Sequence, residues 1–154
     1  MKIFILILAM LGLLNAQQIQ HKVVFDLTTS DIKTFEKRLL SAIVHQKTHY
    51  EGKLEELKVV VVIHGGAYKF FIQDLAASPF KDDKNLVAAH SDLSKRIASM
   101  SQNYEVEFLI CEIGMRGLKI AESTLYDFVK VIPSSTIGLI DKQNEGFAYI
   151  PIPN

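Results

Sequence analysis

The sequence predicts an α/β fold: a three-layer, mostly parallel, five-stranded sheet with helices on both faces. β-Branched runs alternate along the chain with segments in which apolar residues recur at helical spacing. The run 57–63 carries consecutive apolar residues, which is typical of a strand covered on both faces. Two unusual segments, 64–66 and 111–114, directly follow strand-like runs, and strand carboxyl ends are where such sheets form binding sites.

The first expected strand and helix follow an apolar leader. Residues 21–27 are β-branched and aromatic, which favours a strand. Thr29 or Ser30 can cap the next helix, in which apolar residues recur at helical spacing over 32–44. Gly52 then marks the stop before the central strand.

The remaining elements continue this alternation. Pro151 and Pro153 close the last strand and suit the edge of a sheet, where a missing N–H is tolerated. After the run 57–63 we expect helices over 68–77 and 85–100, a strand over 104–110, a helix over 118–128, a strand over 129–132, a helix from Ser134 or Ser135 to Asn144 and a strand over 147–150.

Length and charge set the broad class of protein. The 154 residues correspond to one domain on the usual scale of about 100–200 residues. Lysines and arginines number 17 and aspartates and glutamates 17, so no bulk field attracts nucleic acid. We therefore expect no nucleic-acid partner.

Residues 1–16 have the order of a secretory signal peptide. Lys2 precedes an uncharged apolar run, and the small residue Ala16 precedes Gln17. The run is shorter than the roughly 20 residues that span a bilayer, so we expect no stable membrane span. We expect a single domain over 17–154 in the periplasm or outside the cell, and an uncleaved N-terminal anchor is the alternative.

Cys111 is the single cysteine, so no disulfide can form within the chain. A thiol between a strand and a helix start feels the positive end of the helix dipole, which favours the reactive thiolate. The nearby cations Arg116 and Lys119 would lower the pKa of this thiol further. The alternative is a small, buried and unreactive side chain at a strand end.

His64, Gly65 and Gly66 form the second candidate segment. The histidine can act as a base or hydrogen-bond donor, and the glycines leave backbone amides open to an anion or ligand. The alternative is a strand-end histidine whose glycines only make the turn. The chain has no Gly-x-Ser-x-Gly elbow, which argues against a hydrolase of that class.

The sequence predicts no metal and no cofactor. His45 and His49 are four residues apart, but no third ligand is near them in sequence, and a solvated helix end explains them better. The glycines form neither a Gly-x-Gly-x-x-Gly nor a Walker pattern. Metal or haem binding through Cys111 and a histidine is a remaining alternative.

Three segments resemble the DsrE/DsrF-like family in its YchN-like branch. They are the run 59–71 around His64-Gly65-Gly66, the run 106–115 around Cys111, and the closing segment 131–150. The resemblance implies a compact α/β domain that assembles into trimers or hexamers. It also implies a cysteine that accepts and passes on sulfane sulfur as a persulfide, which would be Cys111, with His64 and Gly65 in the facing loop.

Two functions follow from these interpretations. The first is an exported sulfur carrier or sulfurtransferase in which Cys111 holds the persulfide, and His64, Gly65, Gly66 and Arg116 bind the substrate. Its partner would be a sulfur donor or acceptor protein or a small sulfur compound. The second is an oligomeric ligand-binding or scaffold module with an inert, buried cysteine.

Overall fold

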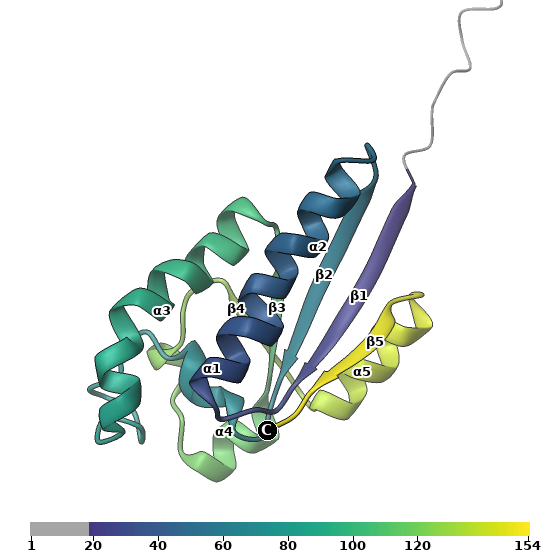
Figure 1. Ribbon diagram of the computed structural model, residues 1–154. Helices are drawn as coiled ribbons and strands as arrows, with labels where there is room; N and C mark the ends of the chain where they lie inside the picture. The colour runs from purple at the N-terminus through teal and green to yellow at the C-terminus, as the bar shows by residue number, and fades with distance from the viewer. Residues whose placement is uncertain (1–18) are drawn as a thin grey trace, which may run out of the picture.

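Five parallel strands form one sheet in the computed structural model, which describes residues 19–154 (Figure 1). The expected signal peptide, 1–16, lies outside the described residues. The strands are β1 (Gln20–Leu27), β2 (Glu56–Ile63), β3 (Glu107–Cys111), β4 (Val129–Ile132) and β5 (Ala148–Ile152). The α-helices are α1 (Ile32–Thr34), α2 (Ala42–Glu51), α3 (Lys84–Asn103), α4 (Glu112–Leu118) and α5 (Ser135–Asn144), with a π-helical segment η1 (Phe35–Ser41) joining α1 to α2.

The order of the strands is β4-β3-β2-β1-β5, and each neighbouring pair is parallel. The prediction of a five-stranded, mostly parallel α/β sheet is therefore confirmed. Strand β2 lies at the centre, and its residues 59–63 are all buried. The unbroken apolar run predicted this position, because a central parallel strand has protein on both faces.

The two faces of the sheet carry different amounts of core. The larger core packs beneath α1, η1, α2 and α3, where Phe35 stacks on Phe70 with 4.3 Å between ring centroids. On the other face, helix α5 covers a small cluster that includes Val24, Val62 and Leu109. Alternation along each strand assigns successive side chains to these two faces.

Two expected helices are wrong. Residues 68–77 contain only the 3-10 segment η2 (Ala67–Phe71) followed by turns, because Tyr68, Phe70 and Phe71 are all buried within one turn and cannot share one face of an α-helix. Residues 118–128 contain the short 3-10 segment η3 (Glu122–Thr124). The helix expected there lies earlier, as α4, and it ends where Lys119 adopts a left-handed conformation with φ of 57°.

The third strand begins later than predicted. Residue Glu105 has a φ of 52°, which is incompatible with an extended strand, so β3 starts at Glu107. Cys111 is still the residue at the carboxyl end of this strand.

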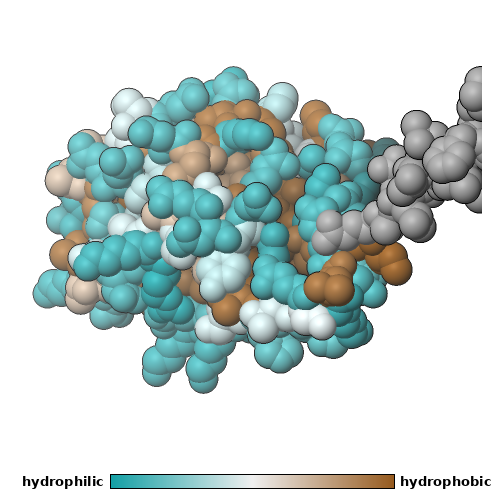
Figure 2. Space-filling model, turned by 90° about the horizontal axis from the view of Figure 1, so that it is seen from above, coloured by the Kyte–Doolittle hydropathy of each residue, from teal (hydrophilic) through white to brown (hydrophobic). Residues whose placement is uncertain are grey.

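Within residues 19–154, no helix has the length and apolar character needed to cross a membrane. The face in Figure 2, seen from above Figure 1, is mostly hydrophilic with smaller hydrophobic areas between.

Candidate functional site

A shallow hollow of about 400 Å³ lies at the carboxyl ends of the central strands. It brings together Cys111 and the loop after β2, the two segments that the sequence analysis placed at strand ends. Its lining residues are His64, Gly65, Tyr68, Cys111, Gly114, Gly117, Leu118 and Ser135.

Cys111 is the last residue of β3 and the N-cap of α4. The residue is only 5% exposed. Burial raises the pKa of the Cys111 thiol, but hydrogen bonds from the Gly114 and Ser135 amides and the Ser135 hydroxyl, together with the nearby Tyr68 hydroxyl, outweigh it and hold the pKa below its ordinary value. These donors therefore increase the thiolate fraction of Cys111 relative to an unperturbed thiol at the same pH.

Tyr68 supports the cysteine from the segment η2. Its hydroxyl donates to the Cys111 carbonyl oxygen at 3.0 Å. Burial, together with the neighbouring Cys111, raises the pKa of Tyr68 well above its usual range, so the phenol remains a neutral donor. Gly114 permits this approach, because a Cβ at this position would overlap the Tyr68 hydroxyl and lie 2.5 Å from Cζ.

The loop after β2 is fixed by its own backbone. Gly65 has a φ of 61°, a left-handed conformation that glycine adopts without strain. The Gly66 amide donates to the Thr28 carbonyl oxygen at 2.9 Å, and a Cβ on Gly66 would lie 2.7 Å from the Ser30 Cβ. Gly66 therefore packs the turn and does not line the hollow, whereas His64 and Gly65 do.

Arg116 and Lys119 do not line the hollow. The Arg116 side chain is 70% exposed and its guanidinium lies 3.8 Å from the Glu112 carboxylate, one turn earlier on α4. Lys119 lies at the end of that helix. The largest influences on the thiol are burial and short-range hydrogen bonds, not the two cations that the sequence suggested.

Besides Tyr68, three polar residues around the site were given no site role by the sequence analysis. Ser135, at the start of α5, lines the hollow with Cys111, and its amide and hydroxyl lower the pKa of the thiol. Asp26 on β1 accepts hydrogen bonds from the His64 ring at 2.6 Å and from the Tyr149 hydroxyl at 2.6 Å. A signal for Asp26 was present, because a carboxylate inside an apolar strand needs a partner.

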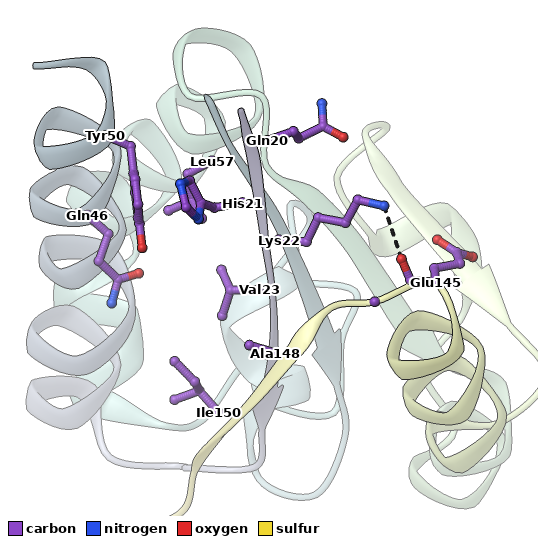
Figure 3. Close-up of a pocket in the computed structure, with 11 residues that line it drawn as sticks. Gln20, His21, Lys22, Val23, Gln46, Tyr50, Leu57, Glu145, Ala148 and Ile150 are labelled. Atoms are coloured by element: carbon purple, nitrogen blue, oxygen red, sulfur yellow. Dashed lines mark hydrogen bonds between the residues drawn. The ribbon is translucent and has the colours of Figure 1, made fainter. Parts of the chain in front are cut away.

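A larger hollow of about 550 Å³ lies at the amino ends of β1 and β2 (Figure 3). His21 stacks on Tyr50 with 4.1 Å between ring centroids and contacts the Glu55 carboxylate at 2.9 Å. The Lys22 ammonium donates to the Glu145 carbonyl oxygen at 3.0 Å. In this larger hollow the Lys22 ammonium and the His21 imidazole already have protein partners, and no cysteine or serine of residues 19–154 lines it. The hollow at Cys111 is therefore the stronger candidate site.

The described part of the chain contains no group of three or more histidine, cysteine or acidic side chains arranged to hold a metal ion. His45 and His49 lie on α2, away from the residues that line the hollow at Cys111. The chemistry available there is that of a thiol with hydrogen-bond donors and an imidazole nearby.

Comparisons with known proteins bear on the whole domain. An uncharacterized protein from Aquifex aeolicus (strain VF5) is 31% identical over 131 residues, which cover 84% of this chain and 55% of that protein. The chain thus spans about half the length of this relative. The solved structure of MTH1491, a protein of unknown function from Methanobacterium thermoautotrophicum, has a TM-score of 0.61 at 22% identity and covers 85% of this chain and 98% of its own.

The structural likeness supports the α/β fold. Residues 22–152 match the model of the DsrE/DsrF-like family, which includes every strand and helix from β1 to β5 apart from the two residues at the start of β1. The chain therefore belongs to the DsrE/DsrF-like family.

Proposed function

We propose that this protein carries sulfane sulfur as a persulfide on Cys111. The observation that carries the proposal is the position of Cys111, the N-cap of α4, in a hollow that His64, Tyr68, Gly114 and Ser135 also line, where nearby donors hold the pKa of the thiol below its ordinary value. A thiolate is the form that attacks sulfur, so a lowered pKa increases the reactive fraction at neutral pH. Membership of a family with sulfur-relay proteins is consistent with this chemistry.

The proposed reaction is a thiol–persulfide exchange. The Cys111 thiolate attacks the outer sulfur of a donor persulfide, R–S–SH. A new S–S bond forms on Cys111 while the S–S bond of the donor breaks, and the donor leaves as the thiolate R–S⁻. The same exchange in reverse passes the sulfur to an acceptor thiol, so no external oxidant or reductant is needed.

The shape of the hollow suits a small or terminal sulfur group. Cys111 is 5% exposed, so a donor has to place its sulfur between the loop after β2 and the start of α4. Within residues 19–154, the Gly65 amide has no hydrogen-bond acceptor, whereas the His64 and Gly66 amides do. We propose that the Gly65 amide and the His64 ring contact the incoming sulfur compound.

The setting is part of the same proposal. We propose that the leader 1–16 exports the chain to the periplasm or the cell exterior, where a single unpaired thiol exchanges sulfur with a donor or acceptor protein or a small sulfur compound. We also propose a trimeric or hexameric assembly. Size-exclusion chromatography with light scattering of the mature chain tests the assembly, and a monomer would contradict it.

The low exposure of Cys111 also favours a second candidate, an oligomeric ligand-binding or scaffold module with an inert thiol. Mass spectrometry after exposure to polysulfide separates the two. The persulfide carrier gains one sulfur atom on Cys111, and Cys111→Ser gains none. No added sulfur on the wild-type protein, or equal addition to Cys111→Ser, would overturn the proposal.

A further inference from the structure

Polar side chains form a row across neighbouring strands at the carboxyl edge of the sheet. Cys111 ends β3, His64 follows β2, Asp26 lies near the end of β1 and Tyr149 lies on β5. The register between β2 and β3 ends with Ile63 opposite Ile110, so His64 and Cys111 are the next residue of each chain segment after this last pair. Both also line the same hollow.

Alternation along the strands places Asp26 and His64 on one face of the sheet. Asp26 comes two residues after Val24, and His64 likewise follows Val62 by two residues. Val24 and Val62 both belong to the cluster under α5. Since side chains two apart share a face, the Asp26 carboxylate and the His64 imidazole lie on the α5 side. Cys111, at the end of β3, packs with the larger core and also lines the hollow with His64 and with Ser135 at the start of α5.

The hydrogen bonds of Asp26 determine which nitrogen of His64 carries a proton. An ionised carboxylate only accepts hydrogen bonds. Its Oδ2 accepts from the Tyr149 hydroxyl at 2.6 Å, and its Oδ1 lies 2.6 Å from His64 Nε2. Nε2 is therefore the protonated nitrogen, and Nδ1 has the lone pair. Within residues 19–154 no hydrogen bond occupies Nδ1.

We infer that His64 is the proton-exchange partner of Cys111, and that Asp26 and Tyr149 are positioning residues that hold its tautomer. This inference rests on the proposed sulfur exchange at Cys111. The thiol S–H bond breaks as an N–H bond forms at Nδ1, giving thiolate and imidazolium with no change in total charge. The imidazolium then returns this proton to the donor thiolate R–S⁻, which leaves as R–SH.

The ionisable groups around His64 fit this assignment. Asp26 contacts Nε2, and Cys111 and Tyr68 line the hollow that His64 shares. Tyr149 contacts Asp26 rather than His64, and this hydrogen bond raises the pKa of Tyr149, which keeps the phenol a donor. The Asp26 carboxylate is thus the charged group placed to stabilise an imidazolium formed at His64.

The first test uses the wild-type protein and needs no sulfur compound. ¹⁵N NMR of the histidine side chains should show His64 as the Nε2–H tautomer when neutral, and Asp26→Asn should increase the Nδ1–H tautomer. Tyr149→Phe, a change at a half-exposed side chain, should shift the tautomer populations in the same direction but less. An Nδ1–H tautomer in the wild-type protein would overturn the inference.

The second test measures the rate of Cys111 alkylation by iodoacetamide against pH. We expect His64→Gln to slow alkylation at pH 7 about tenfold, the effect of one pKa unit on the thiolate fraction. The control is His21→Gln, because His21 also contacts a carboxylate but lies at the opposite end of the sheet. Equal alkylation rates in His64→Gln and His21→Gln would overturn the inference. If His64→Gln does slow alkylation but Cys111 accepts no sulfur from a donor, only the proposed function would be overturned.

Discussion

The substitution Gly114→Ala tests the packing of the site most sharply. A Cβ on residue 114 would overlap the Tyr68 hydroxyl and lie 2.5 Å from Cζ and 2.8 Å from Cε2. Displacing this ring costs about 1–3 kcal/mol as overpacking. Losing the hydrogen bond to Cys111 adds about 1 kcal/mol. Alanine returns about 1 kcal/mol of helix propensity in α4, so we expect a net loss of about 1–3 kcal/mol in the free energy of unfolding.

Gly117→Ala is the matched control on the same helix. A Cβ at Gly117 meets nothing within 4 Å, so the helix propensity should stabilise this variant by up to about 1 kcal/mol. Urea unfolding followed by far-UV circular dichroism should therefore separate the two alanine variants by about 1–4 kcal/mol. Equal stability of the two would refute the close approach of Tyr68 to α4.

Two further predictions concern hydrogen bonds that stabilise the ionised form of a side chain. Asp83→Ala removes the N-cap of α3, where the carboxylate accepts from the Leu86 amide at 3.1 Å, and should cost about 1 kcal/mol in urea unfolding at pH 7. Hydrogen bonds from Leu86 and Lys69 lower the pKa of Asp83 in the folded protein. The stability difference between wild type and Asp83→Ala should therefore have its full size above the ordinary pKa of about 3.9 and vanish as the pH falls through the pKa of Asp83 in the folded protein. A stability difference that does not depend on pH would contradict this prediction. Tyr68→Phe removes a donor and should move the alkylation midpoint of Cys111 upward, and an unchanged midpoint would contradict the role of that hydroxyl.

The strands could be predicted from the sequence because their patterns are local. The consecutive apolar residues of β2 specify a central strand, and β4 was predicted with its observed bounds, 129–132. The segment 67–71 could not be predicted in the same way. Its buried aromatic rings are explained by tertiary packing, such as the stack of Phe35 on Phe70, which overrides the local tendency to form an α-helix.

The site was predictable only in part, for the same reason. Cys111 and His64 could be singled out as candidates because Cys111 ends one strand and His64 directly follows another. The partners of His64 could not, since Asp26 is 38 residues away and Tyr149 is 123 residues from Asp26. Strand order alone brings them together. Arg116 was predicted to bind substrate because it is close to Cys111 in sequence. In the structure it lies one turn after Glu112 on α4, and its guanidinium is near the Glu112 carboxylate.

The rate of Cys111 alkylation against pH in the native wild-type protein tests the central claim, a thiol held ready for exchange, most directly. Cys111 is the single cysteine, so no other thiol contributes to the signal. Because hydrogen bonds at the site lower the pKa of Cys111, we predict a midpoint below the ordinary value of about 8.5. A midpoint at or above about 8.5, together with slower labelling than in the urea-unfolded chain, would contradict the account and favour an inert cysteine.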